Sequence, residues 1–255
     1  MNHRFFVEGD TLAPAQARQI ATVLRLAPGA VVTLVCDGEE LDYRLDRVGR
    51  DEVTGTVVAR RPAAGEPRVA LTLGLPLLRG DRCEEVIEAV TQLGVSRLAP
   101  YTSARSVARE LPEARRERWQ RIAREAAETA RRGRVPLIDP LRDWPALLAA
   151  LPAPVVIPWE EERERTLESA LRSSDVPTGA LEVLAQRPAV SAADAVAPGL
   201  PAALALVIGP EGGLAEEEIA LARARGAVTV TLGPRTFRSE TAASAAVARA
   251  IATLD

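Results

Sequence analysis

Two short segments near the C-terminal end combine glycines with charged residues in a pattern that could bind a ligand. The first loop, residues 207–213, reads VIGPEGG, and the second loop, residues 232–242, reads LGPRTFRSETA. The apolar runs before them cover 204–208 and 227–232, and the helical patterns after them cover 215–225 and 239–254. Ligands of open α/β sheets bind at the carboxyl ends of strands, and glycine lets a backbone approach a ligand closely. The two loops are therefore predicted to form two walls of one site.

The first loop alone fits two interpretations. Exposed backbone N–H groups at the start of a helix favour an anion such as phosphate. The patterns GxGxxG and GxxxxGK are absent from the chain, which disfavours the common nucleotide sites. The plainer alternative is a tight strand-to-helix turn that needs glycine for a positive φ, with the acids at 216–218 stabilising the start of the helix. The second loop nearby favours a binding site.

Three charged residues of the second loop, Arg235, Arg238 and Glu240, lie close together between apolar elements. A solvated charged turn is the ordinary explanation for such a group. A second structural explanation is an arginine–glutamate pair that fixes the loop, with Thr241 capping the next helix.

Residues that support other chemistry are scarce. His3 is the only histidine and lies beside the terminus, which argues against serine–histidine, cysteine–histidine and histidine-ligated metal sites. Cys36 and Cys83 have no ligand spacing, so neither a disulfide framework nor a zinc site is expected. No apolar run reaches the roughly 18 residues of a membrane span, and the first residues lack the apolar core of a secretion signal. A cytoplasmic protein without a metal is therefore expected.

The two loops together resemble the SPOUT superfamily of RNA methyltransferases, and within it the bacterial 16S rRNA (uracil-N3-)-methyltransferase family. Further matches in the same order are RFFV at 4–7, VLRL at 23–26, TQLGV at 91–95, RSV at 105–107 and RWQRIA at 118–123. The resemblance therefore covers nearly the whole chain. It implies an S-adenosylmethionine-dependent enzyme that methylates N3 of a uridine in 16S rRNA of the small ribosomal subunit.

The resemblance also implies roles for residues of both loops, which in this family form much of the S-adenosylmethionine pocket. The implied cofactor-binding residues are Gly209, Glu211, Gly212, Leu232, Gly233, Phe237, Arg238 and Thr241. The candidates for catalysis are Arg235, Arg238 and Glu240, because N3 of uracil must lose a proton before it attacks the methyl group. A carboxylate, an arginine-stabilised uracil anion or water could meet that need.

Three positions depart from the family's pattern. Family members often carry histidine before the VLR segment, where this chain has Arg18-Gln19, and Glu-Gln where it has Glu128-Thr129. After the apolar run 155–157 the family tends to carry His-Pro-Glu, whereas the order here is Pro158-Trp159-Glu160. We therefore carry over the location of this loop and not individual roles. The side chain of Trp159 could equally well pack in the core or form a wall against which a ligand stacks.

Residues 1–66 are expected to form a small β-rich domain, for which the resemblance implies a PUA-like, RNA-binding β-barrel. The predicted elements are strands at 31–36, 41–48 and 53–59, a turn at Asp37-Gly38, and a helix at 15–26 with Ile20, Val23 and Leu24 on one face. A linker is predicted at 60–67, where two prolines and a glycine occur.

Residues 67–255 alternate between strand and helix patterns, which predicts an α/β domain with a mostly parallel sheet. Strands are predicted at 69–75, 96–101, 135–138 and 154–158, and helices at 82–93, 113–132 and 144–151. The long helix is expected to bury Trp119, Ile122, Ala126 and Ala130 and to end at Gly133. The resemblance implies a SPOUT methyltransferase domain with a trefoil knot, and a homodimer that uses the helix at 242–254. Residues 172–203, rich in alanine, proline and serine, are interpreted as a surface insertion.

The net charge of the chain does not suggest an RNA partner, but the distribution of its charges does. The net charge is −3, whereas many nucleic-acid-binding proteins are basic. Residues 97–134, however, contain 11 arginines and five glutamates, and the chain has no lysine. A composition biased toward arginine explains its use in place of lysine but not its clustering, and arginine suits phosphate contacts and base stacking. The predicted contacts to 16S rRNA or the small subunit are Arg4, Arg25, Arg105 and Arg109.

Other classes of function stay open at this point. A non-catalytic RNA-binding protein of ribosome assembly would keep the basic helix and the barrel but need no cofactor pocket. A different RNA methyltransferase of the same superfamily, acting on tRNA or rRNA, would keep the RNA-binding elements and the cofactor pocket. A nucleotide-binding enzyme would use the first loop for phosphate and would not depend on RNA.

Overall fold

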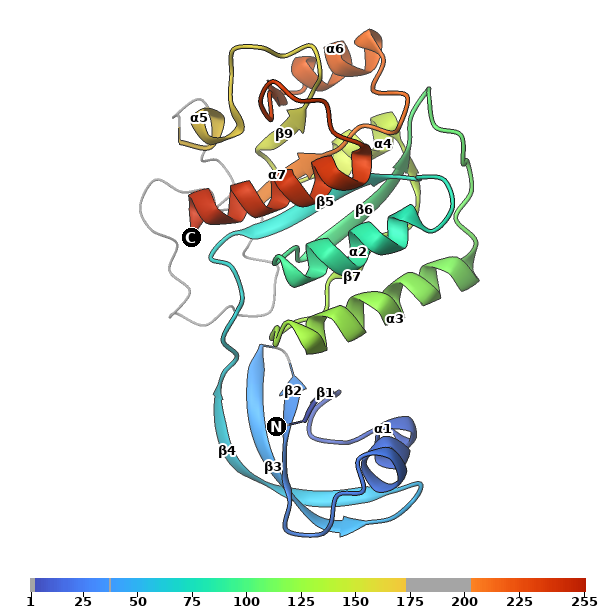
Figure 1. Ribbon diagram of the computed structural model, residues 1–255, viewed down its shortest axis with the longest axis vertical. Coiled ribbons are helices and arrows are strands. Elements are labelled where there is room, and N and C mark those ends of the chain that lie inside the picture. The colour runs from blue at the N-terminus through green and yellow to red at the C-terminus, as the bar shows by residue number, and fades with distance from the viewer. Residues whose placement is uncertain (1–2, 37, 173–202) are drawn as a thin grey trace. The chain divides into compact units, whose positions relative to one another are not determined.

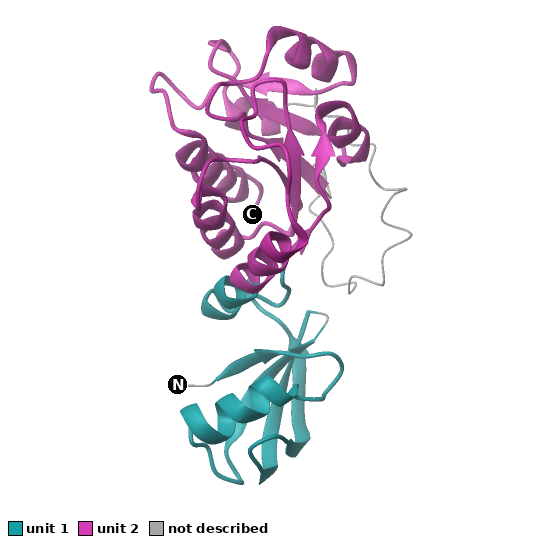
Figure 2. Ribbon diagram, turned by 90° about the vertical axis from the view of Figure 1, so that its right-hand side faces the viewer, with its two compact units in different colours: residues 1–66, 124–135 teal, residues 67–123, 136–255 magenta. Residues whose placement is uncertain are grey.

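The computed structural model describes residues 3–36, 38–172 and 203–255. Its contacts divide the chain into two compact units (Figure 2). One unit comprises Met1–Glu66 and Arg124–Val135, and the other comprises Pro67–Ala123 and Pro136–Asp255. Asp37 of the predicted turn and residues 173–202 of the predicted insertion lie outside the described residues.

The first unit is built on a four-stranded sheet in the order β1-β2-β3-β4. The strands are β1 (Arg4–Phe6), β2 (Val31–Cys36), β3 (Glu39–Val48) and β4 (Val53–Pro62), with β1 and β2 parallel and the other neighbours antiparallel. β4 includes residues 60–62, which the sequence predicts as part of a linker. It continues that far because Arg61 pairs with Glu40 at 2.7 Å and with Asp42 at 2.8 Å on the neighbouring strand.

The predicted helix at 15–26 consists of α1 (Pro14–Arg18) followed by a π-helical turn, η1 (Gln19–Val23). The Leu24 N–H donates to the carbonyl oxygen of Gln19, five residues back, at 2.9 Å. This wider turn moves side chains off the 3.6-residue register of an α-helix. Ile20 is therefore fully buried, whereas Val23, predicted on the same face, is 72% exposed.

The last part of the long helix, α3 (Glu113–Thr129), belongs to the first unit. The predicted domain boundary at residue 66 instead places this part of the helix in the C-terminal domain. Ala127 forms a buried cluster with Phe6 and Val35. Just beyond the helix, the buried guanidinium of Arg132 donates to Glu66 at 2.6 Å. Apolar burial and this ion pair together hold residues 124–135 to the first sheet.

The buried face of α3 is also shifted from the predicted one. Trp119 and Ala126 are buried as predicted, but Ala123 and Ala127 accompany them in place of the half-buried Ile122 and Ala130. The helix ends before Gly133, because Arg131 adopts the left-handed conformation with a φ of 56°.

The second unit contains a seven-stranded sheet, and all of its described strand pairings are parallel. The order is β11-β9-β10-β5-β6-β7, with β8 also paired to β6. The strands are β5 (Ala70–Pro76), β6 (Arg97–Thr102), β7 (Leu137–Ile138), β8 (Arg142–Asp143), β9 (Val155–Pro158), β10 (Ala203–Val207) and β11 (Val228–Val230). This unit thus confirms the predicted α/β class and parallel sheet, while the two-residue strand β8 was not predicted.

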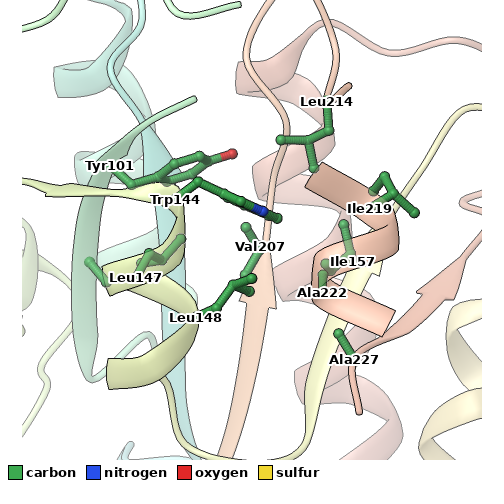
Figure 3. Packing of buried hydrophobic residues seen from close by; sticks show 11 residues of the cluster. Tyr101, Trp144, Leu147, Leu148, Ile157, Val207, Leu214, Ile219, Ala222 and Ala227 are labelled. Atoms are coloured by element: carbon green, nitrogen blue, oxygen red, sulfur yellow. The ribbon is translucent and has the colours of Figure 1, made fainter. Parts of the chain in front are cut away.

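Helices cover the strands of the second unit. They are α2 (Arg82–Gln92), α4 (Trp144–Ala150), α5 (Leu167–Arg172), α6 (Glu216–Ala224) and α7 (Ser239–Leu254), and Figure 1 shows α2 and α7 side by side. Trp144 and Leu147 of α4 pack with Ile219 of α6 and with Tyr101 and Val207 of the strands (Figure 3). This packing fixes the strand ends from which the two loops emerge. No helix among the described residues is long and apolar enough to span a bilayer.

Candidate active site

A cavity of about 820 Å³ lies where strands β9, β10 and β11 end, and we call it the strand-end cavity. Because these strands are parallel, their carboxyl ends meet at one edge of the sheet. Its lining residues are Arg82, Pro158, Trp159, Glu160, Glu161, Arg163, Ile208, Gly209, Pro210, Glu211, Gly213, Leu214, Thr231, Leu232, Gly233, Pro234, Arg235, Thr236, Phe237, Arg238, Ser239 and Ala242. The two loops therefore form walls of one cavity, as predicted.

Glycines in the two loops serve different purposes. Gly213 and Gly233 have φ angles of +69° and +106°, a conformation that side chains rarely adopt. Gly209 does not have a positive φ, and a Cβ atom added there would meet Leu214 at an ordinary 3.5 Å. Gly209 is therefore not required by the turn itself, and its missing side chain instead leaves space in the cavity.

The first loop is held by hydrogen bonds from four other segments. The Tyr101 hydroxyl donates to the Ile208 carbonyl at 2.5 Å, and the Ser239 hydroxyl donates to the Gly209 carbonyl at 2.8 Å. Arg105 donates to the Gly212 carbonyl at 3.0 Å. The carboxylate of Glu211 accepts from the backbone N–H of Arg79 at 3.1 Å and lies 3.4 Å from Arg82. These bonds fix the backbone before any ligand arrives, which lowers the ordering cost of binding.

The second loop is fixed by Arg249 of α7. Its Nη1 donates to the carbonyl oxygen of Leu232 at 2.8 Å, while Nε and Nη2 bind the two carboxylate oxygens of Glu168 at 2.6 and 2.7 Å. The hydrogen bond from Arg249 lowers the pKa of Glu168 below its ordinary value, so this bidentate pair is charged at neutral pH. The loop is therefore tied to both α5 and α7.

The third wall comes from residues 158–160. Trp159 is half-buried, packs against the apolar cluster of Figure 3 and lines the cavity. The guanidinium of Arg223 lies 5.1 Å from the centre of the Trp159 ring, in range for a cation–π contact. Trp159 thus packs against the core and also lines the cavity, and its role as a stacking wall stays a prediction. Glu160 approaches Gly213 so closely that a Cβ atom there would lie 2.5 Å from its Oε1.

Most of the predicted loop residues line the strand-end cavity, but three do not. Those on its wall are Gly209, Glu211, Leu232, Gly233, Arg235, Phe237 and Arg238. Gly212 instead faces Arg105, whose Cβ would lie 3.3 Å from a Cβ atom added at this glycine. The exposed Thr241 does not cap α7, whose N-cap is Arg238 without a side-chain hydrogen bond. Glu240 is turned toward Arg82, 4.0 Å away, so its partner is not an arginine of the second loop.

Cysteine chemistry is excluded at this cavity. Cys83 follows Arg82 in α2 but is fully buried, and its Sγ accepts from the Leu78 N–H at 3.2 Å. Burial raises the pKa of Cys83 to about 11, which keeps the thiol protonated and unreactive at neutral pH. Among the described residues, no group of three histidine, cysteine, aspartate or glutamate side chains could hold a metal ion.

The four arginines predicted to contact RNA differ in availability. Arg4 is structural, because its guanidinium binds Glu40 and donates to the Arg132 carbonyl at 3.0 Å, with only 11% of the side chain exposed. Arg25 is exposed and makes no ion pair with another described residue. Arg105 and Arg109 are exposed, although each donates to one backbone carbonyl, of Gly212 and Ala104.

Much of the arginine excess at 97–134 is paired within the chain. Besides Arg132, the paired arginines include Arg97 with Asp139, Arg116 with Glu113 and Arg118 with Glu84. Of these, only the Arg116 pair lies along α3 itself. Pairing of this kind reduces the number of guanidinium groups that are free for phosphates.

The model of the RNA methyltransferase domain family matches residues 65–251, which include the whole strand-end cavity. The chain belongs to this family.

Two relatives and one solved structure illustrate the likeness. The ribosomal RNA small subunit methyltransferase E of Bacillus subtilis (strain 168) is 30% identical over 233 residues, which are 89% of this chain and 83% of the relative. The protein of that name from Mycobacterium tuberculosis (strain CDC 1551 / Oshkosh) is 30% identical over 252 residues, or 94% and 83%. The crystal structure of ribosomal RNA small subunit methyltransferase E from Neisseria gonorrhoeae, bound to S-adenosyl methionine, has a TM-score of 0.74 at 24% identity and covers 98% of this chain and 96% of that one.

Proposed function

We propose that this protein is an S-adenosylmethionine-dependent methyltransferase that methylates N3 of a specific uridine in 16S rRNA. The observation that carries the proposal is the strand-end cavity, whose walls are the two loops found at this edge of a parallel sheet. The relatives named ribosomal RNA small subunit methyltransferase E support the rRNA substrate. The resemblance to the uracil-N3 family supports the choice of base.

The residues of the cavity fit S-adenosylmethionine. Its volume of about 820 Å³ is in the range of small-molecule sites. Trp159, Leu232 and Phe237 offer apolar surface for an adenine ring, and Gly209 and Gly233 leave room for close backbone approach. When bound, the cofactor supplies an electrophilic methyl group on its sulfonium. The Neisseria gonorrhoeae structure was solved with this cofactor, which supports the assignment.

In this proposal the protein's main task is to position the uridine and to stabilise its anion. N3 must lose its proton before its lone pair can attack a methyl group. Arg235 and Arg238 are exposed on the cavity wall, where their guanidinium groups can stabilise the negative charge that spreads to the uracil oxygens. Glu240 does not line the cavity and lies 4.0 Å from Arg82, so it would first have to turn toward the cavity to take the proton. We therefore assign stabilisation of the uracil anion to the two arginines, with water as the acceptor of the N3 proton.

RNA contacts are proposed for Arg25, Arg105 and Arg109, whose side chains are exposed. On the resemblance given above, we further propose that the first unit acts as a PUA-like RNA-binding module and that the second unit contains a trefoil knot. We also propose that the protein is cytoplasmic and that it forms a homodimer through α7. The four-stranded sheet of the first unit and the alanine-rich sequence of α7 are compatible with these assignments.

Two measurements test the proposed function. Titration calorimetry with S-adenosylmethionine should give one site per chain, and no binding would favour a non-catalytic RNA-binding protein. Mass spectrometry of rRNA from a deletion strain should show the loss of one 3-methyluridine from 16S rRNA. Loss of a different methylated nucleotide would assign another RNA substrate. Binding of a nucleotide in place of S-adenosylmethionine would favour a nucleotide-dependent enzyme.

A further inference from the structure

Arg82, the first residue of α2, lies between two carboxylates, one on the cavity wall and one at the start of α7. Its Nη1 is 3.4 Å from Oε1 of Glu211 in the first loop, and its Nε is 4.0 Å from Oε1 of Glu240 in α7. Arg82 itself lines the strand-end cavity. One guanidinium therefore links the first loop to the helix that follows the second loop.

The two acids depend on this cation to different degrees. Glu211 also accepts a hydrogen bond from the backbone N–H of Arg79 at 3.1 Å. For Glu240, Arg82 is the only side-chain ion-pair partner within the described residues, and Oε2 of Glu240 is buried without a hydrogen bond. Removal of the guanidinium would leave Glu211 with only its backbone N–H partner and Glu240 without its ion-pair partner. The two negative charges, each within 4.0 Å of the lost cation, would then repel one another.

We propose that Arg82 is a positioning residue that sets the separation of the two cavity walls. It neutralises Glu211 and Glu240 together and so holds the first loop and the start of α7 at the distance that the ligand requires. This inference rests on the proposed function, because S-adenosylmethionine is the ligand whose fit depends on that distance. The role is indirect: Arg82 acts on the ligand through the two glutamates.

The test uses S-adenosylmethionine binding by the full-length protein, measured by calorimetry. Arg82→Gln should raise the Kd roughly tenfold, the size of a typical coupling between contacting charged groups. Arg82→Lys, which keeps the charge, should recover part of the affinity. The matched control is Arg118→Gln, because Arg118 also pairs with an α2 acid, Glu84 at 2.6 Å, but does not line the cavity. This control should bind like the wild type.

A double-mutant cycle separates positioning from direct contact. In a Glu240→Gln background the repulsion is already relieved, so Arg82→Gln should cost much less affinity than it does in the wild type. An equal cost in both backgrounds would show that Arg82 touches the ligand itself and would overturn the positioning role.

The two proposals fail in distinguishable ways. A wild type that does not bind S-adenosylmethionine contradicts the proposed function. A wild type that binds, together with a folded Arg82→Gln variant of unchanged affinity, contradicts only the role of Arg82. Thermal unfolding of each variant identifies any that has lost its fold, and the Arg82→Lys variant then carries the test.

Discussion

The hydroxyl of Tyr101 donates a hydrogen bond to the carbonyl oxygen of Ile208 at 2.5 Å, in the interior of the second unit. Tyr101 belongs to β6 and is fully buried, and Ile208 begins the glycine-rich part of the first loop. The ring of Tyr101 also packs 5.4 Å from that of Trp144 (Figure 3). The core of the sheet thus anchors the loop at the point where β10 ends.

Removal of this hydroxyl tests how far the core controls the loop. Tyr101→Phe leaves a buried carbonyl without its donor, which should cost about 1–3 kcal/mol of unfolding free energy and weaken S-adenosylmethionine binding. Denaturant unfolding and calorimetry measure the two effects. Tyr43→Phe, a buried tyrosine of the first unit, is the control and should leave cofactor affinity unchanged. Full affinity in a destabilised Tyr101→Phe variant would mean that the anchor is not needed for binding.

Gly209 provides a steric test of the cavity. Gly209→Val should abolish S-adenosylmethionine binding in a folded protein, because its two γ-methyl groups enter the space that the ligand needs. Gly209→Ala adds only a Cβ atom at 3.5 Å from Leu214 and should retain the fold and measurable binding. Calorimetry and thermal unfolding compare the pair. Unchanged affinity in a folded valine variant would place the cofactor elsewhere.

Arg249 provides a corresponding test of the second loop. Arg249→Gln loses the bond to the Leu232 carbonyl and should weaken cofactor binding about tenfold, since a hydrogen bond from a charged group contributes about 1.5 kcal/mol. The control Glu168→Gln removes the ion pair but leaves Arg249 free to hold Leu232, so its effect on affinity should be smaller. Equal losses in both variants would assign the effect to the ion pair and not to the loop.

Acid should weaken the fold in part through Glu168. Its pKa is lowered from an ordinary value of 4.5, chiefly by the hydrogen bond from Arg249. The resulting stability is complete above the unfolded value and is lost as the pH falls through the lowered folded value. The difference in unfolding free energy between wild type and Glu168→Gln should therefore be constant from neutral pH to about pH 5 and shrink at lower pH. A difference that persists in acid would contradict the assigned pKa shift.

Salt dependence tests the proposed RNA surface. Arg109→Gln should lower rRNA affinity and reduce the salt slope of binding by about one, as expected for one lost phosphate contact, without changing cofactor affinity. Arg116→Gln is the matched control, because Arg116 is already paired with Glu113. Arg105 is less suitable, since its bond to the Gly212 carbonyl couples it to the cavity. If Arg109→Gln keeps the wild-type slope, Arg109 does not contact an RNA phosphate.

The sequence was sufficient to locate both loops and the helices that follow them. An apolar run, then glycine, then an amphipathic pattern is a local signal, and α7 (Ser239–Leu254) has the predicted bounds. The alternative of an arginine–glutamate pair within the second loop is wrong, because the ion-pair partner of Glu240 is Arg82, which is remote in sequence.

Contacts between distant segments account for the other differences. Tyr101 and Arg249 support the loops from neighbouring elements, and no local pattern marks them. Arg105 was predicted as an RNA contact and not as a support of the first loop. Glu218 has the sequence signature of an exposed acid in a first helical turn. In the structure it is 9% exposed, because its carboxylate accepts from the Ala104 and Ala215 N–H groups at 2.8 and 2.9 Å.

The hydrogen bonds that hold the first loop have consequences for protein engineering and for the evolution of related sequences. A graft of residues 207–213 into another scaffold would carry the glycines but not the hydroxyl of Tyr101 or the guanidinium of Arg105, so the transplanted loop would lose its shape. The smallest transferable unit is the loop together with its donors. Among related chains, exchanges at these donor positions should accordingly be inherited with compensating changes in the loop.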